Sequence, residues 1–177
     1  MNITPSHLAG CLLLQPNRFS DERGFFQENY RANAYYAAGI TEPLVQDNWS
    51  RSVKGVLRGM HFQRNQPQGK LVSVLRGEIY DVAVDIRKNS ATFGQWQGIV
   101  LSEHNAQQLW LPPGFAHGFL VLSDVADVIY KTSSYYNAAD EAVFCWNDPQ
   151  LAISWPTPPQ LLSAKDAAAP GFSVALA

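Results

Sequence analysis

The sequence has little of what marks disulfide-stabilised or nucleic-acid-binding proteins. Its 177 residues include only two cysteines, Cys11 and Cys145, too few for a disulfide framework and in no metal-ligand spacing. We expect both to be buried thiols. Charged residues make up 16% of the chain and the net charge is −2, which argues against binding nucleic acid irrespective of sequence, because such binding needs a basic stripe. Any anionic ligand must be held by a few local cations.

Long apolar runs and the common nucleotide-binding motifs are also missing. The N-terminal MNITPSHLAGCLLL has no positively charged leader and only a short apolar stretch, so we expect neither a signal peptide nor a membrane span. There is no glycine-rich phosphate loop, no G-x-S-x-G elbow and no repeat of 20 to 50 residues. With 46% hydrophobic residues and no linker-like segment, the chain predicts one soluble, cytoplasmic domain over residues 1–177.

What the sequence does contain is a β-strand pattern, most clearly over residues 57–87. Apolar residues from Val72 to Ile86 alternate there with polar ones, and Gly77 marks a turn, which is typical of strands with one buried face. Arg58, His61 and Lys70 fall on these strands or their ends. We expect these three side chains to point together into the concave interior of a sandwich or barrel.

The rest of the chain is predicted to be mostly β as well. Strands are expected at residues 10–15, 45–52, 95–101, 107–111, 115–122, 127–133 and 142–146. Residues 20–30 predict a turn followed by alternating aromatic and polar residues, and residues 31–38 predict a helix ended by Gly39. Many short strands with Gly and Pro turns indicate an all-β, antiparallel sandwich of the jelly-roll type with few short helices.

Two histidines, His61 and His117, lie in strand contexts, which raises the question of a metal. His117 ends PPGFAH, the P-x-G-x-x-H half of the second cupin motif, whereas His61 in RGMHFQ lacks the H-x-H that metal-binding cupins offer. Two histidines without a third ligand seldom hold a catalytic ion. We therefore expect a cupin-type jelly roll without a metal.

An ordered set of motifs resembles one family. DERGFF, LRGMHFQ, QGKLVSVLRGEIYDVAVDIR, TFGQW, PPGFAHGF, YKTSSYYN, WNDPQLAISWP and LSAKD follow the order of the dTDP-4-dehydrorhamnose 3,5-epimerases, which are metal-free cupins. The resemblance runs from about residue 21 to about residue 170. It implies a cofactor-independent isomerase that acts in dTDP-L-rhamnose biosynthesis. This enzyme inverts C3 and C5 of dTDP-4-dehydro-6-deoxy-D-glucose, and its product is dTDP-4-dehydro-L-rhamnose.

The resemblance also implies catalytic roles. A proton beside a ketone leaves when a positioned base takes it and the enolate is stabilised. His61 matches the family's base, Asp166 the carboxylate that orients it, and Tyr130 the proton donor. Lys70 and His117 match positions beside the sugar, where the Lys70 ammonium can stabilise an enolate oxygen.

For the nucleotide, the resemblance assigns Arg23 and Arg58 to the diphosphate. Glu28, Gln46, Asn48 and Tyr136 match positions at the nucleotide end, and Phe26, Glu141 and Lys165 match further substrate-binding positions. Tyr136 matches the residue that stacks on thymine; since neighbours on a strand face opposite ways, only one of Tyr135 and Tyr136 can line the pocket. The family implies a homodimer in which the Arg23 segment reaches across from the partner subunit.

Three alternatives differ in the residues that they need. A sugar-nucleotide binding module uses Arg23, Arg58 and Tyr136 but has no need of a base and an acid. A metal-dependent cupin oxygenase needs a ligand set that this chain lacks. An epimerase acting at C3 alone or at C5 alone shares the whole framework, so a single sequence leaves that alternative and the identity of the nucleotide base open.

Overall fold

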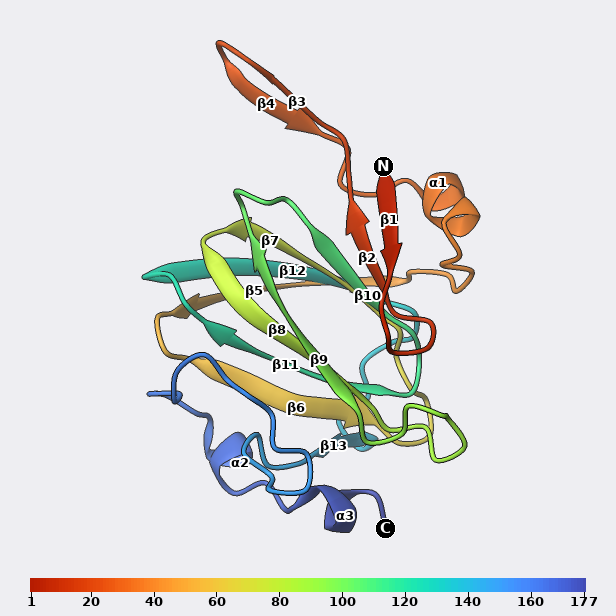
Figure 1. The fold of residues 1–177 in the computed structure, drawn as a ribbon, viewed down its shortest axis with the longest axis vertical. Coiled ribbons are helices and arrows are strands. Elements are labelled where there is room, and N and C mark those ends of the chain that lie inside the picture. The colour runs from red at the N-terminus through yellow and green to blue at the C-terminus, as the bar shows by residue number, and fades with distance from the viewer.

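The computed structural model describes residues 1–177 and consists mainly of two antiparallel sheets packed face to face (Figure 1). The six-stranded sheet contains, in spatial order, β1 (Asn2–Pro5), β2 (Leu12–Gln15), β10 (Gln108–Leu111), β7 (Lys70–Arg76), β12 (Val125–Thr132) and β5 (Gln46–Val53). The five-stranded sheet contains β13 (Glu141–Val143), β6 (Leu57–Gln63), β11 (Phe115–Val121), β8 (Glu78–Asp85) and β9 (Trp96–Ser102). The prediction of an all-β jelly-roll fold is confirmed.

The main core lies between the two sheets. Val72 of β7 and Val128 of β12 project inward from one sheet and meet Ile79 of β8 and Phe119 of β11 from the other. All four side chains are buried. Burying one apolar side chain of this size stabilises the folded state by about 1.5–3 kcal/mol. This apolar core fills one part of the space between the sheets, and polar side chains line the other part.

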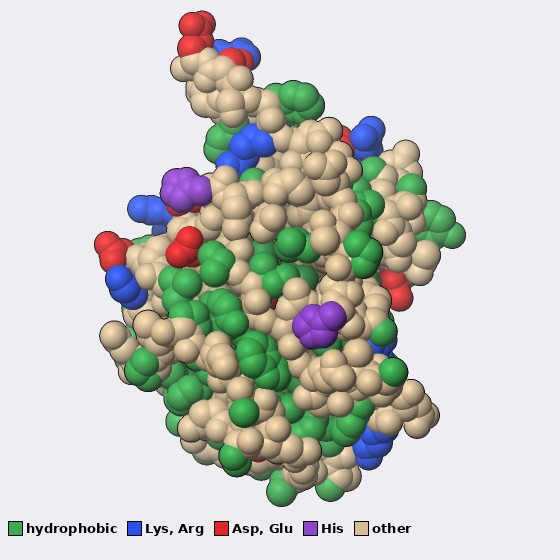
Figure 2. Space-filling view, viewed as in Figure 1, with side chains coloured by type: hydrophobic (Ala, Val, Ile, Leu, Met, Phe, Trp, Pro, Cys, Tyr) green, Lys and Arg blue, Asp and Glu red, His purple; other side chains and the backbone are tan.

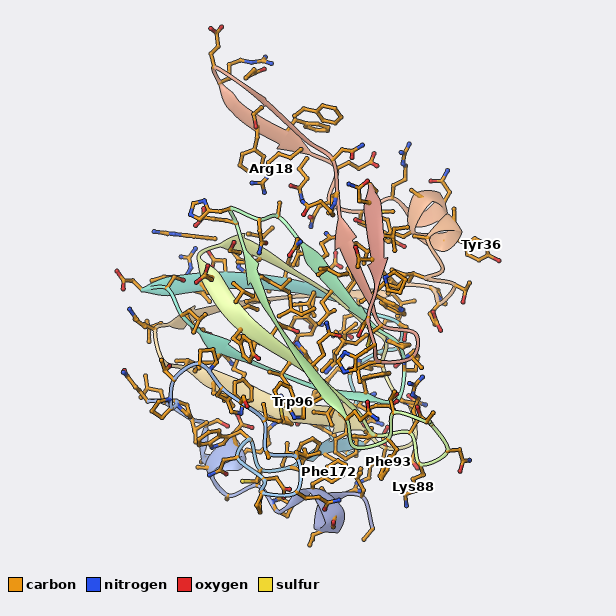
Figure 3. The ribbon with its side chains drawn as sticks, viewed as in Figure 1. Arg18, Tyr36, Lys88, Phe93, Trp96 and Phe172 are labelled. Carbon is orange, nitrogen blue, oxygen red and sulfur yellow. The ribbon has the colours of Figure 1, made fainter.

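The expectation that these strands bury only one face is wrong for the central ones. In β7 and β8 most residues are buried, including neighbours that face opposite ways, because other parts of the chain cover the outer faces. Helix α1 (Ala32–Ala37) contributes Tyr35 to a cluster with Leu71 and Trp110 outside the six-stranded sheet. The C-terminal segment covers the five-stranded sheet, where Phe172 of α3 (Phe172–Ala175) approaches Phe93 and Trp96 (Figure 3).

Most predicted elements differ from the structure by one to three residues at their ends. Strand β2 begins at Leu12 rather than at residue 10, and α1 covers Ala32–Ala37 with Gly39 beyond it at φ +101°. Strand β1 was not predicted: its NITP sequence is exposed throughout and forms a strand only by pairing with β2. The four-residue helices α2 (Ala164–Ala167) and α3 were not predicted either, since four residues carry no helical period.

The cysteine prediction holds for one residue only. Cys11 is buried, and burial raises the pKa of its thiol to about 12. Cys145 is partly exposed, because it lies in an irregular segment after β13 and its thiol bonds the Asn147 side chain. No helix of the chain is both long and apolar enough to span a lipid bilayer.

Residues 18–27 form a hairpin that leaves the body of the molecule. Strands β3 (Arg18–Asp21) and β4 (Gly24–Gln27) pair only with each other, and Figure 1 shows them projecting away from both sheets. Figure 2 shows charged side chains of both signs at the tip. Phe25 and Phe26 are exposed on β4. A two-stranded hairpin without a covering layer is at most marginally stable in water. We therefore expect this hairpin to pack against another protein surface.

One irregularity decides which side chains β6 directs inward. His117 pairs with His61 and Phe119 pairs with Arg58, so two steps along β11 match three along β6. Such a bulge changes the facing of the residues beyond it. It places Arg58 and His61, which are three residues apart, on the same face of the sheet. Gly59 and Gly118 make the bulge possible, because a Cβ on Gly59 would lie 2.5 Å from the Gly118 Cα.

We predict that Gly59→Ala lowers the free energy of unfolding by about 1–3 kcal/mol, the usual cost of overpacking. Gly24→Ala is the matched control, because Gly24 also has a positive φ, of +124°, but a methyl group added there would meet no atom within 4 Å. Denaturant unfolding of both variants measures the difference. An equal loss in the two variants would mean that the backbone angle, and not the approach of β11, requires glycine at position 59.

Candidate functional site

The polar part of the sandwich holds two adjoining cavities, of about 270 Å³ and about 230 Å³. His61, Lys70, Tyr130, Tyr136 and Glu141 line both. The five-stranded sheet supplies His61 and Glu141, and the six-stranded sheet supplies Lys70 and Tyr130. Because the two sheets face each other, a molecule in the cavity has His61 on one side and Tyr130 on the other.

His61 is paired with Asp166. The His61 Nε2 lies 2.6 Å from Asp166 Oδ1, and Asp166 is buried in α2, whose first turn is capped by the Ser163 hydroxyl. Burial by itself raises the pKa of Asp166, but the hydrogen bond and charge of His61 outweigh it and hold that pKa below its usual value. A neutral imidazole that donates from Nε2 to a carboxylate keeps Nδ1 free to accept a proton. The pair therefore has the form of a general base with its orienting group.

Lys70 is the buried cation of the site. It begins β7 with 8% of its surface exposed, and burial lowers the pKa of its ammonium group to about 8, against the opposing charges of Asp81 and Glu141. A charge held away from bulk water interacts strongly with a developing oxyanion. Lys70 is thus suited to stabilise an enolate oxygen.

Tyr130 lines the cavity from β12 and is partly buried. Burial raises the pKa of its phenol, while the charge of Arg58 opposes that rise. The phenol therefore stays protonated at neutral pH and is able to donate. Arg58 lines the second cavity, and its Nε donates to the Ser52 hydroxyl at 3.0 Å.

A second histidine–carboxylate pair lies beside the first. His117 Nε2 is 2.8 Å from Asp81 Oδ2, and in the register of β11 and β6 His117 is the direct neighbour of His61. Asp81 is fully buried, and its Oδ1 has no hydrogen-bond partner in the chain. Sequence reasoning missed Asp81, although an aspartate between Ile79 and Ala83 interrupts the buried positions of β8, which is a usable signal.

At the mouth of the cavity, polar groups surround Tyr136. Its hydroxyl lies 3.1 Å from Glu141 Oε2, and the same oxygen accepts from Lys165 Nζ at 2.7 Å. Gln46 and Asn48 line this part of the cavity from β5. Tyr136 lines the cavity and Tyr135 does not. The premise that both tyrosines stand on a strand is wrong, because β12 ends at Thr132 and both lie in the following loop.

Three of the expected site residues lie elsewhere. Arg23 is at the tip of the projecting hairpin, 84% exposed, with its guanidinium paired to Asp21. Phe26 and Glu28 line a separate cavity beside α1, and Glu28 pairs with Arg31 at 3.0 Å. None of the three lines the cavity of His61 within this chain. Spacing along the sequence could not reveal this, because the hairpin turns away from the sandwich.

Comparisons with known proteins decide the family. The family model for dTDP-4-dehydrorhamnose 3,5-epimerase matches residues 5–173. The chain is 51% identical to the Escherichia coli dTDP-4-dehydrorhamnose 3,5-epimerase, over 94% of this chain and 91% of that protein.

Comparison with solved structures indicates the same family. The 3,5-epimerase from Legionella pneumophila, in complex with dTDP-4-keto-L-rhamnose, superimposes with a TM-score of 0.95 at 52% identity, covering 98% of this chain and 93% of that one. The dTDP-4-dehydrorhamnose 3,5-epimerase from Bacillus anthracis, with TDP and pyrophosphate bound, gives a TM-score of 0.93 at 45% identity, over 97% and 99% of the two chains.

The chain belongs to the dTDP-4-dehydrorhamnose 3,5-epimerase family. This confirms the resemblance drawn from the ordered motifs and identifies the protein as an isomerase of the cupin-type fold. The roles of individual residues stay predictions, and the geometry of the cavity indicates which substitutions test them.

One such prediction concerns Asp166 of this epimerase. Asp166→Asn keeps the size of the side chain and removes the charge opposite His61, so we expect kcat to fall by a factor of about 10² or more, because a positioned base is worth about 10²–10⁴. Steady-state assays with the dTDP-4-keto sugar measure the change. The midpoint of thermal unfolding is the control for folding. An unchanged kcat in a folded variant would show that Asp166 does not assist His61 as the base.

Proposed function

We propose that the protein is a cytoplasmic, cofactor-independent enzyme that converts dTDP-4-dehydro-6-deoxy-D-glucose into dTDP-4-dehydro-L-rhamnose. The observation that carries the proposal is the placing of His61 and Tyr130 on facing sheets across one cavity. Inverting a carbon beside a ketone requires a base on one face of the sugar ring and an acid on the other. The two side chains meet that requirement.

Each inversion is balanced by two proton transfers. His61 takes the proton from the carbon next to the C4 ketone, and the electron pair of that C–H bond becomes the enolate, whose oxygen the Lys70 ammonium stabilises. Tyr130 then gives its phenolic proton to the opposite face of the same carbon, and the C4 carbonyl reforms. The enzyme is left with an imidazolium and a phenolate, and exchange with solvent water resets both before the next inversion.

The nucleotide occupies the mouth of the cavity in this proposal. Arg58 and His117 reach the region between sugar and diphosphate, and Tyr136 stacks on the base, with Gln46, Asn48, Glu141 and Lys165 around it. A guanidinium such as Arg58 suits phosphate oxygens, because it offers paired donors and stays charged.

The exposed hairpin leads us to propose a homodimer with a shared site. Arg23, Phe26 and Glu28 lie outside the cavity of their own chain, and the hairpin that carries Arg23 and Phe26 has no covering layer. In a two-fold dimer each hairpin reaches the partner subunit's cavity by the same contacts. Arg23 then adds a second guanidinium at the diphosphate, and Phe26 supplies an aromatic face opposite Tyr136.

We predict different failures for the base and the acid. His61→Ala lowers turnover by a factor of about 10²–10⁴ while the affinity for dTDP stays nearly the same, because the imidazole acts on the sugar alone. Tyr130→Phe keeps exchange at C5 better than product formation, since abstraction by His61 does not need the phenol. Deuterium exchange at C5 and product yield are followed together in each variant. Equal loss of both in Tyr130→Phe contradicts this division of labour.

The acidity of Lys70 gives a pH prediction. Burial lowers the pKa of Lys70 to about 8, so the charged form prevails below that pH and is lost as the pH rises through it. Because kcat/KM reports ionisations of the free enzyme, we expect kcat/KM to decline above about pH 8. Lys70→Met is the control: its low residual rate should show no such decline. A decline of kcat/KM that persists in Lys70→Met would be due to the ionisation of another group.

Mixed dimers test the shared site. Arg23→Ala and His61→Ala are each expected to be nearly inactive alone, but a dimer with one subunit of each kind contains one intact site. Random mixing of the two after dissociation should therefore restore about a quarter of wild-type activity. If Arg23 served the cavity of its own chain, mixing would restore none.

A further inference from the structure

The loop of residues 133–140 carries Tyr136 and has no regular secondary structure. Tyr136 is 52% exposed, so packing within the chain does not fix its ring. Loops with exposed side chains are usually mobile, and a mobile ring is a poor stacking surface because ordering it on binding costs conformational entropy. Something else must hold the backbone on either side of Tyr136.

Gln63 holds one side. It ends β6, only 4% of its surface is exposed, and it lines the same cavity as Tyr136. Its Oε1 accepts from the Asn137 backbone N–H at 2.8 Å. Its Nε2 donates to the Gln66 carbonyl at 2.8 Å and more weakly to the Tyr135 carbonyl at 3.4 Å.

Two further glutamines hold the rest of the loop. Gln46 Oε1 accepts from the Tyr136 backbone N–H at 3.0 Å, and its Nε2 donates to Asn48 Oδ1 at 2.8 Å. Gln68 Nε2 donates to the Ser134 carbonyl at 2.8 Å. All three glutamines line the cavity. Each peptide group from Ser134 to Asn137 is therefore bonded by a carboxamide that comes from outside the loop.

The position of Gln63 on β6 links this arrangement to the chemistry. Gln63 lies two residues after His61, so the two side chains face the same way along the strand. One rigid strand thus places the imidazole at the sugar end and anchors the loop at the nucleotide end. The strand β6 and these amide bonds thus help to set the separation of His61 from Tyr136.

We infer that Gln63 and Gln68 are positioning residues that preorganise Tyr136 as a stacking surface for the nucleotide base and so set the affinity for the nucleotide end of the substrate. The inference rests on the proposed function, in which Tyr136 stacks on that base. Gln46 shares the task, since both ends of its carboxamide are engaged within the chain. We expect the arrangement to act on binding alone, because these amides bond the backbone of the loop and belong to neither the proposed base nor the proposed acid.

The test is a double-mutant cycle with Tyr136. Gln63→Met and Gln68→Met remove the amides and keep the chain length. Either is expected to raise Kd for dTDP and KM for the sugar nucleotide about tenfold, the effect of one or two lost hydrogen bonds. The value of kcat is expected to stay within about twofold, as for a loss of uniform binding. Gln150→Met is the matched control, because Gln150 is exposed and bonds only Ser173 and its own turn.

The cycle separates positioning from loop stability. In a Tyr136→Ala background the same glutamine substitutions should change Kd for dTDP less than about twofold, because the ring that they position is gone. An undiminished loss in that background overturns the inference while leaving the proposed function intact. If Tyr136→Ala alone leaves the Kd unchanged, both the stacking assignment and the inference fail. If Gln63→Met does not fold, the cycle with Gln68→Met decides in the same way.

Discussion

The register shift between β6 and β11 is the constraint on which the site depends. Without it, Arg58 and His61 would face opposite sides of the five-stranded sheet, since they are three positions apart on β6. With it, Arg58, His61 and Gln63 all face the interior, and Met60 and Phe62 pack outside with the C-terminal segment. Two glycines in contact permit the shift, because any side chain there would collide with the opposite strand. A backbone irregularity therefore aligns the three side chains that we propose as base, phosphate-binding group and loop anchor.

The second feature of the site is the concentration of buried charge in an otherwise ordinary core. Lys70, Asp81, His117 and Asp166 are all buried, although each costs free energy to remove from water. Pairing offsets part of that cost for the two histidine–aspartate pairs, whereas Lys70 has no direct partner and has its pKa lowered instead. The proposed reaction through an enolate gives this arrangement a purpose, because in it a negative charge beside Lys70 develops only as the proton leaves the sugar.

The sequence was sufficient to predict most of the fold, and it named His61, Lys70 and Tyr130, which the structure brings to one cavity. Alternation and turn residues placed β11 at 115–122 against the observed Phe115–Val121, and the ordered motifs led to the family. Asp166 required the family resemblance, since a four-residue helix in an alanine-rich tail has no periodicity to read. The expectation that Tyr135 and Tyr136 face opposite ways assumed that both lie on a strand, but β12 ends at Thr132, before either residue. The separation of Arg23 from His61 and the bonds from Gln63 to the loop of residues 133–140 depend on long-range contacts, so no local pattern encodes them.

Proton NMR of the dTDP-4-keto sugar incubated with the enzyme in D₂O tests double inversion, with the signals at C3 and C5 followed separately against an enzyme-free control. We expect deuterium to enter both carbons, because in the proposed mechanism one cavity with a base and a facing acid inverts each in turn. Incorporation at only one carbon would contradict double inversion and make the protein a single-site epimerase. Incorporation at neither carbon would contradict the proposed chemistry altogether.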